Sequence, residues 1–155
     1  MTQATIRARI KTTLDTVSNK GLTHDYLRWA VQQSAFETIA KTTISSVVQI
    51  RAWMITWRGF SQVEPYINRQ GAPNQIRVHT FELHGYLGLD DSAATEKTFA
   101  ALAELVCTTL DADSTLNADA MSTYRNPTQL AVDEVSWHGH LCHHAAITFQ
   151  VAETI

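Results

Sequence analysis

At 155 residues, 45% hydrophobic and 17% charged, the chain has the size and composition of one globular domain. A chain of this length buries enough apolar surface to fold alone, which excludes the class of small domains that depend on disulfides or a structural metal. No apolar run is long enough for a signal peptide or a membrane span, and Cys107 and Cys142 match no disulfide framework, so we expect a protein of the reducing cytoplasm.

The net charge of −3 hides an uneven distribution along the chain. Residues 1–80 contain 10 lysines and arginines against 4 aspartates and glutamates, whereas residues 81–155 contain 2 against 11. The two parts therefore carry +6 and −9. Such an asymmetry bears on partners and says nothing about fold.

An N-terminal helical region is predicted over residues 3–40. Apolar residues recur at helical spacing over 3–18, with three basic residues between them: Ile6, Ile10, Leu14 and Val17, and Arg7, Arg9 and Lys11. This pattern predicts an amphipathic helix that ends at the Asn19-Lys20-Gly21 segment. A second helix is predicted from Thr23, its candidate N-cap, to about Ala40.

The remaining residues, 44–155, are predicted to form the sheet and its main helix. β-branched and aromatic residues predict a first strand over 46–58, with Trp53 and Trp57 on one face for core or interface packing. Residues 59–75, with their glycines and prolines, predict a long connection that protrudes from the sheet and contacts a partner. Its contact candidates are Phe60, Glu64, Tyr66 and Arg69.

A second strand is predicted over residues 76–87, where Gly85 marks a bulge or a close approach of another group. His79 and His84 fall on opposite faces of that strand. Asp90-Asp91-Ser92 then predicts the start of a third helix that runs to about Leu110, since these side chains cap free backbone N–H groups. We interpret the adjacent carboxylates as capping groups, not as a catalytic pair.

After a polar connection over 111–131, residues 132–137, a turn at His138-Gly139 and residues 140–151 predict a C-terminal hairpin. The order of elements predicts a single α+β domain, residues 1–155. We expect an antiparallel or mixed four-stranded sheet with helices packed mainly on one face, a sandwich of two layers.

The C-terminal hairpin carries the sharpest chemical signal. Four potential metal ligands share one face if the strand is continuous: His138, His140, Cys142 and His144. Imidazole and thiolate are preferred zinc ligands, but the spacing matches no established zinc motif and no glutamate is placed as a general base. We favour structural histidines and no cofactor, and keep a small metal-binding module or metal-dependent enzyme as the alternative. Phosphate loops, nucleophile elbows and dinucleotide fingerprints are lacking, so we expect no enzyme.

Three segments resemble small proteins encoded among the tail genes of tailed bacteriophages and prophages, of the tail terminator or tail-completion family: His79–Tyr86, Asp90–Phe99 and Gly139–Thr148. The likeness covers about half of the chain, mostly residues 76–110 and 132–153. The helical N-terminal region and the histidine cluster depart from this pattern. A neck or connector-associated protein of the same broad fold is the alternative within this resemblance.

The resemblance implies a structural virion protein assembled in the host cytoplasm. Such proteins form a hexameric ring on the head-proximal end of the tail tube, end its polymerisation and join it to the head connector, while genomic DNA passes through the lumen without sequence-specific binding. In a ring each subunit presents two unlike surfaces. The charge asymmetry offers candidates for these two surfaces. Alternatively, the acidic residues line the lumen of the ring, where they would repel the passing DNA. The candidates are Arg7, Arg9 and Lys11 on one surface, and Asp90, Asp91 and Glu96 on the other.

Overall fold

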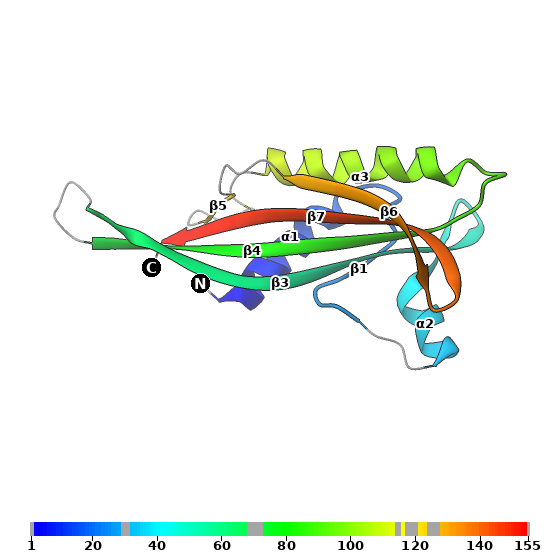
Figure 1. The fold of residues 1–155 in the computed structure, drawn as a ribbon, viewed down its shortest axis with the longest axis horizontal. Helices are drawn as coiled ribbons and strands as arrows, with labels where there is room; N and C mark the ends of the chain where they lie inside the picture. The colour runs from blue at the N-terminus through cyan, green and yellow to red at the C-terminus, as the bar shows by residue number, and fades with distance from the viewer. Residues whose placement is uncertain are drawn as a thin grey trace.

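The structure is a computed structural model that describes residues 2–28, 32–67, 73–113, 116, 121–123 and 128–154. Helices and strands alternate irregularly along the described chain (Figure 1): α1 Gln3–Asp15, β1 Leu22–His24, α2 Gln33–Ala40, β2 Lys41–Ile44, β3 Val47–Ile67, β4 Pro73–Gly88, α3 Thr95–Ala112, β5 Met121–Thr123, β6 Gln129–Trp137 and β7 His140–Thr154. None of the described helices is long and apolar enough to cross a membrane.

Three long antiparallel strands, in the order β3, β4 and β7, form the centre of the sheet. Short strands extend both edges: β1 runs parallel to β3, and β5 and β6 both pair antiparallel with β7. The sheet is therefore mixed and has six strands, while β2 forms a separate ladder on β3. The α+β class is confirmed, but the expectation of four strands is wrong. The two additional strands, β1 and β5, have three residues each, which is too short for a two-residue alternation to be recognised.

The larger hydrophobic core lies between the sheet and the helices α1 and α3. The helices contribute residues three or four apart, and the strands contribute every second residue, so each element buries one face. Representative fully buried members are Ile6, Ile10, Ile55, Phe81, Leu83, Phe99 and Val106. Burying a side chain of this kind contributes about 1.5–3 kcal/mol.

A smaller core lies on the opposite face of the sheet, where α2 packs over one end. Phe36 of α2 meets the Trp137 ring edge-on, with 4.9 Å between ring centroids. Ala52 and Met54 of β3 point into this core, whereas Trp53 between them points into the larger one. The two-layer sandwich therefore consists of the sheet with α1 and α3, and α2 adds a partial third layer.

The second helix is shorter than the sequence predicts. Gly21, at φ +88°, turns the chain so closely over Arg51 that a Cβ would lie 2.2 Å from the Arg51 carbonyl oxygen. The next residues then run alongside β3, and Leu22 pairs with Ala52 as the first residue of a parallel ladder. Thr23 is therefore a strand residue and not an N-cap, because tertiary pairing overrides local propensity.

The third helix begins at Thr95, later than the sequence predicts. The Asp90 carboxylate accepts hydrogen bonds from the Ser92 hydroxyl at 2.7 Å and from the Ala93 backbone N–H at 3.3 Å, which closes a turn ahead of the helix. Ala94 then takes a left-handed conformation with φ 50°, so the helix cannot extend backwards. Asp90 is a capping residue as expected, but it caps a turn.

Residues 59–75 belong mainly to a long hairpin, because β3 continues to Ile67 and β4 begins at Pro73. Gly59, at φ 122°, accompanies a register shift after Trp57, which is how the strand absorbs an extra residue. Pairing between β4 and β7 stops at Ile76, and Figure 1 shows that the outer part of the hairpin extends beyond the helices. The predicted irregular connection is thus replaced by a protruding two-stranded arm.

Candidate functional site

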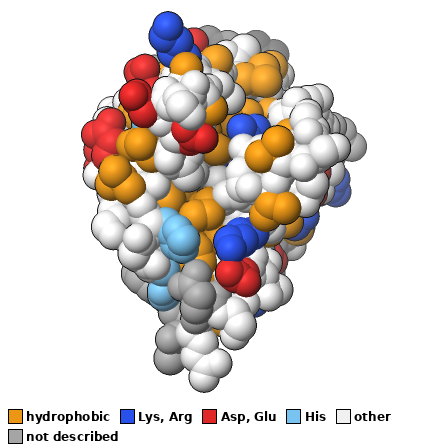
Figure 2. Space-filling model, turned by 90° about the vertical axis from the view of Figure 1, so that its right-hand side faces the viewer, with side chains coloured by type: hydrophobic (Ala, Val, Ile, Leu, Met, Phe, Trp, Pro, Cys, Tyr) orange, Lys and Arg blue, Asp and Glu red, His pale blue; other side chains and the backbone are white. Residues whose placement is uncertain are grey.

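A pocket of about 790 Å³ lies at the end of the sheet opposite this arm, where the β2–β3 turn, the β4–α3 connection and the β6–β7 turn meet. Four of its lining residues are exposed and apolar: Val47, Val48, Leu89 and Leu141. Figure 2 shows this end of the molecule, with hydrophobic side chains around a hollow and acidic side chains along one margin. Its size lies in the range of small-molecule sites.

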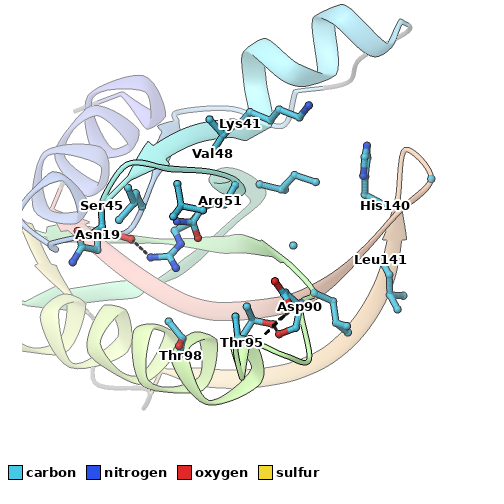
Figure 3. A pocket seen from close by; sticks show the side chains of 18 residues that line it. Asn19, Lys41, Ser45, Val48, Arg51, Asp90, Thr95, Thr98, His140 and Leu141 are labelled. Carbon is cyan, nitrogen blue, oxygen red and sulfur yellow. Dashed lines mark hydrogen bonds between the residues drawn. The ribbon is translucent and has the colours of Figure 1, made fainter.

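Arg51 of β3 is the buried cation of the pocket, with 7% of its surface exposed. Its Nη1 donates a hydrogen bond to the Asn19 carbonyl oxygen at 2.6 Å, which Figure 3 marks. The close approach of Gly21 holds the Asn19-Gly21 turn in this place, and Trp53 fastens the same turn by donating from Nε1 to the Lys20 carbonyl oxygen at 3.0 Å. Burial lowers the pKa of Arg51 from its ordinary value.

The other charged groups of the pocket are already engaged. Lys41 forms an ion pair with Glu37 at 2.6 Å, and Asp90 is exposed and holds its own turn. The guanidinium of Arg51 forms no ion pair with the described residues, and its Nε is buried without a hydrogen-bond partner among them. The pocket therefore contains a cation that the described chain leaves without an anion.

A second polar cluster crosses the open face of the sheet. Nδ1 of His144 and the Asp133 carboxylate lie 2.6 Å apart, and Nε2 of His144 lies 3.1 Å from Nδ1 of His84. Because His144 donates to Asp133, its Nε2 is left to accept from His84. Glu82 lies 3.6 Å from the far nitrogen of His84. The hydrogen-bonded row therefore runs from His84 through His144 to Asp133, and Glu82 lies beside its other end.

Sequence reasoning named His84 and His144 separately and missed that they form a cluster. Its members come from three strands, and Asp133 and Glu82 read as ordinary surface residues of alternating strands. Burial lowers the pKa of His84, and the nearby His144 lowers it further, while Glu82 acts in the opposite direction. Tyr86 covers the cluster, with its ring 5.0 Å from that of His144.

The four candidate metal ligands lie in the β6–β7 turn and at the start of β7, and they do not form one group. His138 lies in the turn, and the His140 ring stacks on Phe36 with 5.3 Å between centroids. Cys142 is buried, and burial raises the pKa of its thiol to about 11. Within the described residues no group of three histidine, cysteine, aspartate or glutamate side chains could hold a metal ion. His143 points to the helix side and lies 3.1 Å from the Thr95 hydroxyl.

A buried pair on the helix side also escaped the sequence analysis. Trp57 Nε1 donates to His79 Nδ1 at 3.3 Å, so His79 donates through Nε2 to Glu153 at 3.0 Å. The side chains of His79 and Glu153 are 3% and 2% exposed. Burial acts to raise the pKa of Glu153, but the hydrogen bond from His79 is among the causes that lower it below its ordinary value. No local pattern links residues so far apart in the chain.

The proposed interface residues occupy different parts of the molecule. Arg7 donates to the Asp25 carbonyl oxygen at 3.2 Å, Arg9 is exposed, and Lys11 pairs with Asp15 at 2.8 Å, all on α1. Asp90, Asp91 and Glu96 are exposed around the start of α3. Figure 1 shows that the start of α3 lies at the pocket end, away from the first residues of α1.

The contact candidates of the arm are only partly described. Phe60 is 52% exposed, and the guanidinium carbon of Arg77 lies 4.6 Å from its ring centroid. Glu64 and Tyr66 lie in β3, and Arg69 lies outside the described residues. No protein-family model matches the chain, and no curated protein sequence matches it significantly.

Proposed function

We propose that the chain is a structural ring subunit of a phage tail, of the tail terminator kind. In this proposal a homo-oligomeric, six-membered ring caps the head-proximal end of the tail tube, ends its polymerisation and joins it to the head connector, and the chain has no catalytic role. The observation that carries the proposal is the long arm formed by β3 and β4, which extends beyond the helices and whose strands, past the Val63–Ile76 pair, are paired only with each other among the described residues.

The edge of β3 next to the arm is open and can pair with another chain. β1 and β2 cover β3 only up to Met54, so the described residues leave the edge of β3 unpaired from Ile55 to Ser61. Unpaired backbone N–H and C=O groups are a template for pairing with another chain. Phe60, exposed on the same stretch, adds apolar surface to that edge. A neighbouring subunit or the tube protein would cover both.

The charge distribution supports a contact between unlike surfaces. The basic candidates lie on α1 and the acidic candidates at the start of α3, and these places are separated along the molecule. A ring requires such a heterologous contact, since each subunit offers one surface to a different surface of the next. Charge pairing across it would fix orientation more than it would add affinity.

Light scattering after size exclusion, followed by negative-stain electron microscopy, tests the proposal. We expect closed rings, and we expect the purified protein to stop the growth of tubes formed by the tail tube protein of the same phage. A protein that stays monomeric at high concentration and leaves tube length unchanged would contradict the proposal. Stoichiometric zinc in protein purified without a histidine tag would favour the metal-binding alternative.

A further inference from the structure

Arg51 has an electrostatic environment unlike that of the other buried cation nearby. Lys20 is exposed to 9% and pairs with Asp15 at 2.9 Å, whereas Arg51 is exposed to 7% and pairs with no carboxylate of the described chain. A guanidinium cannot relieve the cost of burial by losing its proton. A buried charge is normally compensated by an opposite charge and by hydrogen bonds that use its donors.

The described residues leave most N–H donors of the Arg51 guanidinium without a hydrogen bond. Its five N–H groups form one hydrogen bond with the described residues, from Nη1 to Asn19. Figure 3 shows the side chain inside the pocket, between the β2–β3 turn at Ser45 and the α3 residues Thr95 and Thr98. The cavity next to the guanidinium is therefore wide enough, and has enough polar neighbours, to accept an anionic group.

The remaining charges define which anion fits. Lys41 is neutralised by Glu37, so one positive charge, that of Arg51, is left to compensate. A carboxylate brings one negative charge and a planar pair of acceptors that matches the guanidinium fork. A phosphate dianion would bring a second negative charge that no remaining cation of the pocket compensates, and Asp90, which lines the same pocket, would repel it. The exposed apolar residues at the mouth, Val47, Val48, Leu89 and Leu141, favour hydrocarbon beside the carboxylate.

We propose that this pocket is a carboxylate-binding site, in which Arg51 holds the carboxylate and the apolar rim contacts the hydrocarbon attached to it. The carboxylate belongs either to a free organic acid or to an acidic side chain of a second copy of the chain, whose residues 81–155 carry 11 acidic groups. The site goes beyond the ring function and does not depend on it.

Thermal unfolding with hexanoate, with hexanol and with inorganic phosphate tests the ligand class on the whole chain. At a hundredfold excess over its Kd, hexanoate should raise Tm by roughly 5–10 °C. Hexanol has the same number of carbon atoms without the charge, and it should have little effect. An equal shift with phosphate that also depends on Arg51 would overturn the assignment to a carboxylate.

Two matched variants locate the effect. Arg51→Met removes the unpaired charge and keeps a similar volume but loses the hydrogen bond to Asn19; because these effects oppose each other, Tm of the free protein should change little, and the hexanoate shift should be abolished. Lys41→Met removes the cation that is already paired, and it should keep the shift. If Arg51→Met does not fold, Arg51→Lys takes its place: it retains charge but not the fork, and the shift should shrink.

Light scattering distinguishes the two sources of the carboxylate. If the source is a second copy, folded Arg51→Met should be less assembled than the wild type, and hexanoate should dissociate the wild-type assembly. If the source is a free acid, the Tm shift should occur without any change in assembly. A wild type with neither a hexanoate shift nor Arg51-dependent assembly would refute the site, and rings that form regardless of Arg51 would leave the ring function standing.

Discussion

His84 ties the stability of the fold to pH. Burial lowers its pKa from the ordinary value of 6.5, and burial does the same for His24. The folded state therefore favours the neutral ring, while the unfolded chain binds the proton more readily. The free energy of unfolding should be at its full value above about pH 6.5 and should fall as the pH drops below it.

Urea unfolding at pH 7.5 and pH 5.5 measures this dependence. His84→Gln keeps a donor for His144 but no longer titrates, so the loss of stability between the two pH values should be smaller in the variant. The remaining loss should shrink again when His24→Gln is added. An identical loss in the wild type and in His84→Gln would assign the pH dependence to other groups.

Gly85 is where the packing of β4 leaves least room. A Cβ at this position would lie 2.4 Å from the ring of Trp53, which is 1% exposed and is held by its hydrogen bond to Lys20. We expect Gly85→Ala to destabilise the protein by about 1–3 kcal/mol through overpacking. Gly88→Ala on the same strand is the control, since its Cβ would meet Ile50 at 3.5 Å, an ordinary contact. Equal midpoints of denaturation for the two variants would contradict this view of the core.

The arm is an element whose removal should separate assembly from folding. Val63 pairs with Ile76, and Ile76 is the residue of β4 nearest the tip of the arm that still pairs with β7. Replacing residues 64–75 with Asn-Gly would join this pair by a two-residue hairpin turn. The shortened chain should keep its stability to within about 0.5 kcal/mol, because the described strand residues of the replaced part pair only with each other and not with β7.

The same shortened chain should fail to form rings and should fail to stop tube growth, as measured by light scattering and electron microscopy. A shortened chain that still forms closed rings would show that the arm has no part in assembly. Phe60→Ser, which leaves the arm at full length, tests the exposed strand edge separately and should weaken assembly less.

Elements with a long, regular pattern of apolar residues were predictable from the sequence. Short elements, and elements that depend on pairing with a strand distant in sequence, were not. The periodicity of Ile6, Ile10 and Leu14 predicted α1, and the alternation from Ala145 to Val151 predicted most of β7. β1 and the outer part of β3 depend on partners that are distant in sequence, so no local signal marks them. Gly85 was the exception, because a glycine in a strand suggests a close approach and Trp53 supplies it.

The candidate sites were less predictable than the fold. The face shared by His140, Cys142 and His144 follows from strand alternation alone, but the partners of these residues do not. Arg51 lies in a run of strand residues and has no sequence feature that distinguishes a buried arginine from an exposed one. Its pocket is built from segments around residues 19, 45, 90 and 140, which only the fold brings together.

At the scale of the whole molecule, the two charged surfaces should act as a pair. Reversing Arg7, Arg9 and Lys11 to glutamate should weaken assembly, and adding Asp91→Lys and Glu96→Lys should restore part of it. Asp90 is better left unchanged, because its carboxylate closes the turn before α3. High salt should also weaken assembly of the wild type by screening exposed charges.

The thermal stability of each charge variant serves as the control. Lys11→Glu places a like charge one helical turn from Asp15, which costs a few tenths of a kcal/mol, so Tm should change little. If the reversed protein forms rings of unchanged stability, the basic residues do not lie at the contact. The acidic residues would then be assigned to the lumen, where they would repel passing DNA.

The position of β7 has a consequence for the order in which the protein is made. It is the last strand along the described chain, yet it lies inside the sheet, between β4 on one side and β5 and β6 on the other. While the ribosome is still making this strand, β4 has an open edge and both β5 and β6 lack their partner. The nascent chain is then exposed to aggregation, so folding has to wait for synthesis of β7. A stop codon just before His140 would accordingly remove the middle of the sheet and leave its margins behind.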